Sequence, residues 1–171
     1  MPPPDDTFET RFRHWLLAIL RVGLGGLFIF AAFMKLSNPQ AAFDAVNAFK
    51  FEVFGTRLPE HLAHLAAFVL PWAELIAGVC LVVGLWTRAA AATILVLLGL
   101  FTFLIVSALS RGLDVKCSCF GKVEFPCTGG VGTCHIVRNS VLILWTLIVL
   151  GFGAGAVSID RTAARRAAER D

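Results

Sequence analysis

Four long apolar stretches constrain this 171-residue chain more than any other feature of its sequence. They cover residues 15–34, 62–85, 89–109 and 136–157, and the third contains no charged residue. A helix needs about 20 mostly apolar residues to cross a bilayer. None of the four stretches shows the continuous polar face of a helix on a soluble domain. The pattern therefore predicts an all-α membrane protein, a bundle of four transmembrane helices.

The composition argues against the soluble classes of protein. Charged residues make up 16% of the chain and hydrophobic residues 57%, with a mean hydropathy of +0.77, whereas a soluble domain has about 25% charged residues. The net charge is only +3 and the basic residues are scattered. A soluble enzyme, a disordered chain and a nucleic-acid binder are therefore disfavoured, and membrane lipid is the expected surrounding.

The first apolar stretch has an alternative interpretation as a cleaved signal peptide, with Arg11 and Arg13 as its charged start. Its apolar run is longer than the 7–15 residues usual for such a segment, so we expect it to remain as a helix. The expected organisation is a disordered cytoplasmic segment over residues 1–14, a membrane domain over 15–157 and a basic cytoplasmic tail over 158–171.

The distribution of basic residues predicts the orientation. Four spans place both termini on one side, and lysine and arginine are divided almost equally between the sides. The positive-inside rule gives most weight to basic residues beside short loops, here the tight turn at Arg88 and the arginine-rich tail. We therefore expect a multi-pass protein of the bacterial inner membrane, with cytoplasmic termini and both longer connections outside.

The first of these connections covers residues 36–61. Asn38-Pro39 is a helix stop signal. Residues 41–54 then place apolar side chains among polar ones at a spacing that suits a short amphipathic helix at the membrane interface. A lid packed on the bundle is the alternative.

The second connection holds four cysteines within 18 residues: Cys117, Cys119, Cys127 and Cys134. Cysteines this dense are typical of an oxidising compartment. Four cysteines allow three pairings, and proximity favours Cys117–Cys119 with Cys127–Cys134. A bridge within C-x-C closes a small ring, and departure from relaxed geometry makes a disulfide easier to reduce. The second bridge spans three glycines that let the chain turn, so it is interpreted as a structural or a resolving pair.

Two further interpretations of this loop stay open. The first is a pair of plain stapling disulfides. The second is a zinc site, for which four cysteines and His135 are suitable ligands, although C-x-C is not the common ligand spacing. We expect no metal. Cys80, alone in the second span, is interpreted as a small packing residue.

Two charged residues lie well inside the apolar spans, Arg21 in the first and Glu74 in the second, whereas Arg138 is near the edge of the fourth. A charge at the centre of a membrane helix costs about 2.5–3.5 kcal/mol on insertion scales. Because the two helices run antiparallel, we expect Arg21 to reach Glu74 and fix the helix register. The alternative is that Glu74 handles a proton in a quinol or thiol reaction, with Pro71 opening the helix locally one turn before it.

Several polar residues are candidates to support thiol chemistry at the outer side. Lys35, Arg138 and Lys116 are cations that would stabilise a thiolate, and interfacial snorkelling is their alternative role. His135 follows Cys134 directly and is a candidate base. His61 and His64 are one turn apart and would bind a metal or a quinone carbonyl, or else serve as polar residues at the interface.

The segment CSCFG at residues 117–121 resembles the CxCFG signature of the MauE/DoxX group of small four-helix membrane proteins. The stretches at residues 21–36, 70–78 and 84–88, and VRN at 137–139, match that group in the same order, so that the resemblance covers residues 15–157. The second cysteine pair, Cys127 and Cys134, is not required by the group's pattern.

The resemblance implies a redox-associated membrane protein. MauE proteins are linked to maturation of a disulfide-rich periplasmic subunit of methylamine dehydrogenase, and DoxX relatives to thiosulfate and quinone redox chemistry. The expected function is thiol–disulfide exchange with a periplasmic thiol protein or membrane redox subunits, with quinone as the candidate cofactor. This would make the chain a thiol–disulfide or quinone-linked oxidoreductase. The alternatives are a non-catalytic assembly subunit with stapling disulfides and a small transporter.

Overall fold

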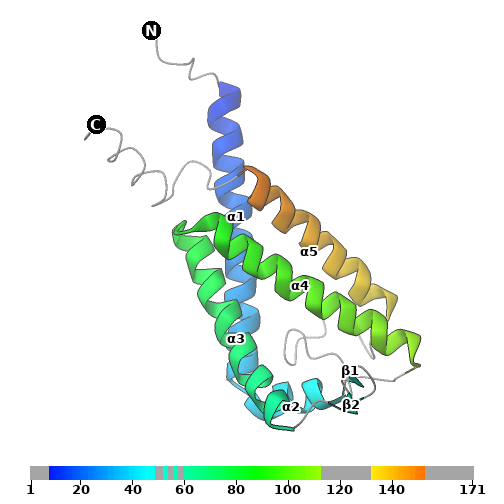
Figure 1. The fold of residues 1–171 in the computed structure, drawn as a ribbon. Helices are drawn as coiled ribbons and strands as arrows, with labels where there is room; N and C mark the ends of the chain where they lie inside the picture. Colours follow the sequence, from blue (N-terminus) through cyan, green and yellow to red (C-terminus); the bar gives the residue numbers. More distant parts are fainter. Residues whose placement is uncertain (1–7, 49–51, 54–55, 58–59, 113–131, 153–171) are drawn as a thin grey trace.

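The computed structural model describes residues 8–48, 52–53, 56–57, 60–112 and 132–152. Four helices within these ranges are long and apolar enough to cross a membrane. They are α1 (Phe8–Leu36), α3 (Glu60–Val83), α4 (Thr87–Ser110) and α5 (Thr133–Phe152) (Figure 1). The predicted fold class, an all-α bundle of four membrane-spanning helices, is confirmed.

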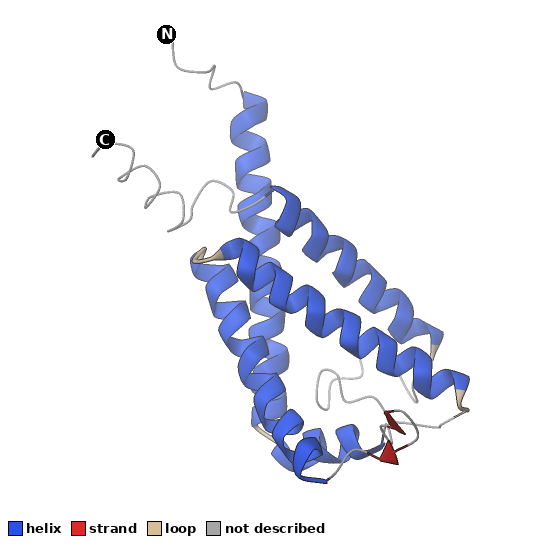
Figure 2. Ribbon diagram, in the orientation of Figure 1, coloured by secondary structure: helices blue, strands red, loops and turns tan. Residues whose placement is uncertain are grey.

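Short elements connect α1 to α3. The helix α2 (Pro39–Ala48) is followed by the two-residue strands β1 (Glu52–Val53) and β2 (Thr56–Arg57), which pair antiparallel with Glu52 opposite Arg57 (Figure 2). The expected stop at Asn38-Pro39 is present, because α1 ends at Leu36 and α2 begins at Pro39. Proline suits the first position of a helix, where its missing N–H has no partner to lose.

All four long helices begin earlier than the hydropathy indicates, α1 and α5 by the largest margins. The 29 residues of α1 make a helix about 43 Å long, against about 30 Å for a hydrocarbon core, so its first turns extend beyond the core. Residues 8–14 belong to α1 and are helical, whereas the sequence predicts a disordered segment there. The start of α5 at Thr133 places Cys134 and His135 in a helix rather than in a loop. The expected end of this span, residues 153–157, and the tail at 158–171 lie outside the described residues.

A tight turn joins α3 to α4. The backbone N–H of Gly84 donates to the carbonyl oxygen of Cys80, and the N–H of Leu85 donates to the same oxygen. Gly84 has φ 75° and Trp86 has φ 48°, so the chain reverses through left-handed conformations of the kind that end many helices. The turn makes α3 and α4 consecutive antiparallel helices.

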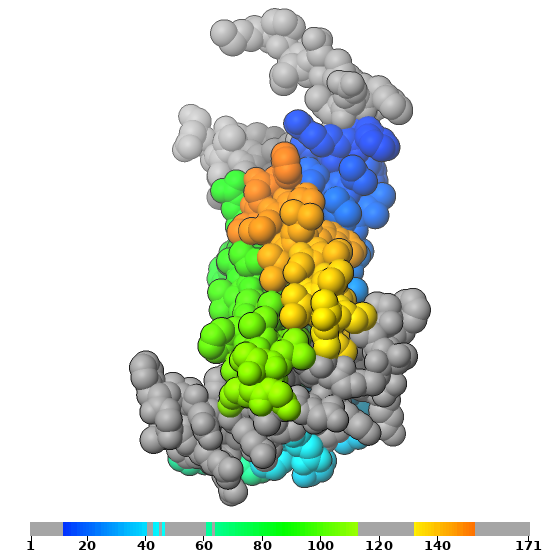
Figure 3. Space-filling view, turned by 90° about the vertical axis from the view of Figure 1, so that its right-hand side faces the viewer, coloured from blue at the N-terminus to red at the C-terminus, as the bar shows by residue number. Residues whose placement is uncertain are grey.

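Close backbone contact joins α1 to α3. A Cβ atom on Gly25 would lie 2.7 Å from the carbonyl oxygen of Gly78, and a Cβ on Gly78 would lie 2.9 Å from that of Gly25. Only glycine allows this approach. On the other side of α1, the indole N–H of Trp145 in α5 donates to the Leu20 carbonyl oxygen at 3.0 Å. Figure 3 shows α4 and α5 side by side, with the start of α1 beside the later turns of α5.

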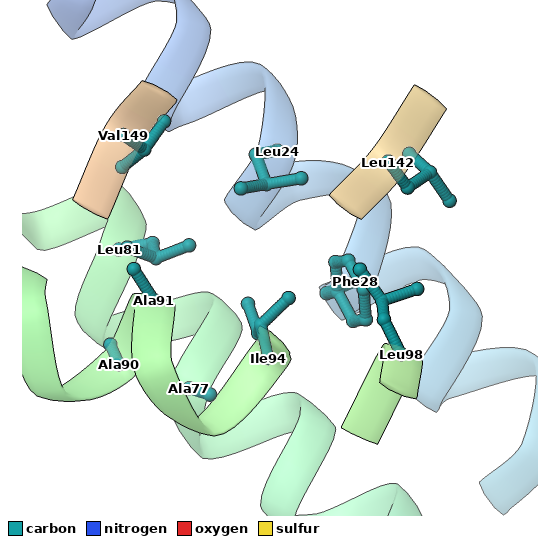
Figure 4. Close-up of a cluster of buried hydrophobic side chains, with 10 residues drawn as sticks. All are labelled: Leu24, Phe28, Ala77, Leu81, Ala90, Ala91, Ile94, Leu98, Leu142 and Val149. Carbon is teal, nitrogen blue, oxygen red and sulfur yellow. The ribbon is translucent and has the colours of Figure 1, made fainter. Parts of the chain in front are cut away.

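The apolar core lies where all four long helices meet. Its buried side chains come from α1, α3, α4 and α5 alike: Leu24, Phe28, Ala77, Leu81, Ala90, Ala91, Ile94, Leu98, Leu142 and Val149 (Figure 4). Cys80 packs against this cluster as a free, half-buried thiol. This position agrees with its interpretation as a packing residue.

The bundle has two distinct ends. The start of α1, the α3–α4 turn and the last turn of α5 lie at one end, which we call the turn end. The α2 end, opposite, holds α2, the two strands, the last turns of α1 and α4 and the first turns of α3 and α5 (Figure 1). The first turn of α1 and the last turn of α5 therefore lie at the same end of the bundle.

The helix α2 packs on the first turns of α3. The ring of Phe43 stacks on the imidazole of His64, with centroids 3.8 Å apart and planes 9° from parallel. This packing agrees with the lid interpretation of the segment, and its position at a membrane interface stays a prediction.

Candidate functional site

A largely buried ion pair joins the last turn of α1 to the middle of α3. The Nζ atom of Lys35 donates to both carboxylate oxygens of Glu74, at 2.6 Å to Oε1 and 2.7 Å to Oε2. The side chains are 11% and 2% exposed, respectively. Lys35 lies in the last turn of α1, and its long side chain can point back towards the N-terminus of its helix. An ammonium group at the end of one helix thereby reaches a carboxylate in the interior of another.

An aromatic ring from α4 covers the cation. The Nζ atom of Lys35 lies 4.8 Å from the centroid of the Phe101 ring, within the range in which the face of an aromatic ring attracts a cation. The pair carries no net charge, which lowers the cost of placing it in apolar surroundings. Three helices therefore contribute to one polar site.

This arrangement corrects the expected pairing of Arg21 with Glu74. Glu74 is bound by Lys35, and Arg21 lies 14 residues earlier on α1, about 21 Å along the helix axis. Arg21 is also buried, at 2% exposure, but it lies nearer the turn end than Glu74 does. The contact between Gly25 and Gly78 sets the register that separates Arg21 from Glu74. In addition, α3 continues as an α-helix through Pro71 rather than opening there.

A second polar contact joins α4 to α5 at a similar depth. The side-chain amide of Asn139 donates to the hydroxyl oxygen of Thr102 at 3.3 Å, and that hydroxyl donates to the carbonyl oxygen of Leu98 at 2.7 Å. Thr102 follows Phe101 directly, so this contact and the ion pair lie within one helical turn of each other along α4. Sequence reasoning missed Phe101 and Thr102 as site residues. The one signal for Thr102 was a polar residue inside an uncharged apolar span.

The first turn of α5 holds two of the predicted site residues. Cys134 is disulfide-bonded, and its partner lies outside the described residues. The backbone N–H of Gly132 donates to Nδ1 of the buried His135 at 3.4 Å, and the His135 N–H donates to the Gly132 carbonyl oxygen at 3.0 Å. The histidine side chain thus accepts the hydrogen bond that a glutamate or glutamine at the third helical position accepts in a capping box. Its Nδ1 is an acceptor, so the proton of the neutral ring is on Nε2.

The remaining predicted residues are distributed as follows. Arg138 is half-buried one turn after Cys134, and His61 and His64 are exposed at the start of α3. Lys116, Cys117, Cys119 and Cys127 lie outside the described residues, and with them the cysteine pairing and the zinc alternative. Their predicted roles stay predictions.

A protein-family comparison identifies the chain. The family model described as "Methylamine utilisation protein MauE" matches residues 13–152. The chain belongs to the MauE family. The MauE part of the resemblance is thereby confirmed, and the DoxX part stays a prediction. No curated protein and no solved structure matches the chain.

Several partnered polar groups of this MauE-family bundle lie between its middle and the α2 end. The match covers all four long helices and the connection between α4 and α5. It therefore includes the ion pair, the amide–hydroxyl contact and the histidine cap at the start of α5. This collection offers a proton acceptor, a cation and hydrogen-bond donors inside apolar helices, which are the groups that redox chemistry with proton transfer needs.

Proposed function

We propose that this chain is a membrane thiol–disulfide redox protein that acts in methylamine utilisation, as the description of its family indicates. It oxidises cysteine thiols of a disulfide-rich partner outside the cytoplasm and passes the electrons to a membrane quinone. The observation that carries the proposal is the MauE match over residues 13–152, which includes the CSCFG segment at 117–121.

The proposed exchange balances in two steps. A thiolate of the partner attacks one sulfur of a Cys117–Cys119 disulfide, forming a mixed disulfide and releasing the other cysteine as a thiolate. A second partner thiolate then attacks the mixed disulfide, so that the partner is oxidised and both cysteines are reduced. A quinone reoxidises them, taking two electrons and two protons to become a quinol.

The position of the cysteine segment supports exchange at one end of the bundle. Gly112 and Gly132 are the described residues on either side of it, at the end of α4 and the start of α5. Both helix ends belong to the α2 end (Figure 1). The partner would therefore approach this end, where α5 also holds Cys134 in its first turn.

Trapping of the mixed disulfide tests the proposal. With only one cysteine of C-x-C present, the remaining thiolate can attack a disulfide of the oxidised partner, the reverse of the second step, but no second cysteine is there to resolve the mixed disulfide. Cys119→Ser or Cys117→Ser should therefore hold an oxidised partner covalently. The assay is a non-reducing gel of the chain incubated with a disulfide-rich extracytoplasmic partner, followed by mass spectrometry of the linked peptides. Quinone reduction by the reduced partner should fall to the rate without protein.

Cys80→Ala is the matched control, because this free thiol lies in the apolar core and should leave trapping and quinone reduction unchanged. If neither loop variant captures a partner and both keep the wild-type rate of quinone reduction, the redox proposal is wrong. Cysteine variants that only lower stability would instead indicate an assembly subunit whose cysteines staple the loop.

A further inference from the structure

We propose that Lys35 and Glu74 form the proton-exchanging pair of this redox cycle. When thiols are oxidised, Glu74 takes up a proton and releases Lys35 from the ion pair. A bound quinone would supply the electron acceptor, and Lys35 would be the cation available to hold its oxygen. The proposal rests on the proposed function and adds to it the residues that move charge within the bundle. The S–H bonds of two thiols break, an S–S bond forms, and the two electrons pass to the quinone. One of the two protons forms an O–H bond on Glu74 before it reaches the quinone, and the other reaches the quinone through solvent.

Helix register alone does not account for the pair. The contact between Gly25 and Gly78 already fixes how α1 sits on α3, because a Cβ atom on either glycine would lie within 3 Å of the other's carbonyl oxygen. Lys35 and Glu74 belong to this same interface. Replacing a buried ion pair by apolar side chains is often neutral or stabilising, so a purely structural role would not require two charges here. An ionisable residue inside a membrane segment points instead to proton or ligand chemistry.

The geometry of the pair suits a carboxylate that loses its charge on protonation and then releases its cation. A single ammonium group binds both oxygens of Glu74, so protonation of the carboxyl group removes most of what holds Lys35 in place. Glu74 is fixed in the interior of α3, whereas Lys35 is the more exposed partner and lies in the last turn of α1. Its four-carbon stem can carry the cation outward while the helix stays in place. The cation is therefore the mobile member and the carboxyl group the fixed one.

Few other charges in the described ranges compete for this pair. The helices that pack against α3 are α1, α2 and α4. Phe101 of α4 presents a ring to the cation rather than a charge. The remaining described charged groups on these three helices with side chains placed are near helix ends, on an exposed surface or at the turn end: Arg13, Arg21, Asp44, Arg88 and Arg111. Among these described groups, Lys35 is thus the charged side chain that contacts Glu74.

Replacement of both charges separates proton exchange from a structural role. The double variant Lys35→Met, Glu74→Met keeps side chains of similar length without leaving a buried charge unpaired. We expect quinone reduction by a dithiol to fall by roughly 100-fold, the lower end of what a positioned acid–base group contributes, with thermal unfolding close to wild type. A double variant that is folded and as fast as wild type would overturn the proposal. Asp44→Asn, which removes an exposed carboxylate from α2, is the control and should keep the wild-type rate.

Infrared difference spectra between the oxidised and the reduced protein give a readout that a structural role would not move. We expect a band of a protonated carboxyl group that changes with redox state, shifts in heavy water, disappears in Glu74→Gln and persists in Asp44→Asn. A wild-type protein that reduces no quinone would overturn the proposed function itself. Normal turnover without a Glu74 band would overturn only the role of the pair.

Discussion

At the scale of single residues, two of the buried polar groups are held by side chains from neighbouring helices. Glu74 has Lys35, and the amide of Asn139 has the hydroxyl group of Thr102. Apolar surroundings make an unpaired polar group costly, so each contact constrains two helices at once. The ion pair ties α1 to α3, and the amide–hydroxyl contact ties α4 to α5.

Removal of the amide should weaken the second of these ties. We expect Asn139→Ala to lower the free energy of unfolding by about 1 kcal/mol, the size of an interhelical hydrogen bond in a membrane protein. The measurement is unfolding in sodium dodecyl sulfate followed by tryptophan fluorescence, since the chain has four tryptophans. The exposed neighbour Ser140, whose hydroxyl donates to the Ile136 carbonyl oxygen within α5, supplies the control Ser140→Ala. Equal stability of both variants would show that the contact with Thr102 contributes nothing.

At the scale of helices, one pair of glycines determines how α1 lies on α3. Gly25 and Gly78 bring the two backbones into contact, and this sets which residues of α1 come level with Glu74. Gly26 follows Gly25 directly, yet a Cβ atom there would meet nothing within 4 Å. Two adjacent glycines therefore have different roles, one in a helix contact and one on an open face.

Alanine substitutions at Gly25 and Gly26 should separate these two roles. In Gly25→Ala the new methyl group would lie 2.7 Å from a backbone oxygen, and we expect a loss of about 1–3 kcal/mol in unfolding free energy from overpacking. Gly26→Ala meets no neighbour and should stay within about 1 kcal/mol of wild type, with helix propensity in its favour. The same detergent unfolding measures both. Equal losses would show that the backbones do not touch at Gly25.

The helix contact also explains what the sequence could and could not predict. Hydropathy located the four spans because each is long enough to cross a bilayer, and local chemistry predicts the stop at Asn38-Pro39. The pairing of Glu74 depended on register, which hydropathy does not contain. Arg21 looked closer to the centre of its span than Lys35 did, but the contact at Gly25 and the reach of a lysine stem selected Lys35. The start of α5 was misjudged because Thr133, Cys134 and His135 are less apolar than the span that follows.

At the scale of the whole molecule, the two ends of the bundle differ in chemistry. The α2 end has the lid, the ion pair nearby and both flanks of the cysteine segment. Near the turn end, Trp15 and Trp86 are exposed, in keeping with the aromatic belt at a membrane interface. Arg88 lies in the first turn of α4 at the same end. A bundle with such ends should insert in one orientation only.

That orientation follows from the cost of moving short basic loops across a membrane. Because the α3–α4 turn is tight and Arg88 adjoins it, the positive-inside rule predicts that the turn end lies in the cytoplasm and the α2 end outside. We expect a fluorescent-protein fusion after Arg88 to fluoresce and an alkaline phosphatase fusion there to be inactive. The reverse should hold for fusions after Gly112, the described residue that precedes the cysteine segment. Phosphatase activity after Arg88 would place the cysteines in the reducing cytoplasm, where a disulfide exchange of the proposed kind would not be sustained.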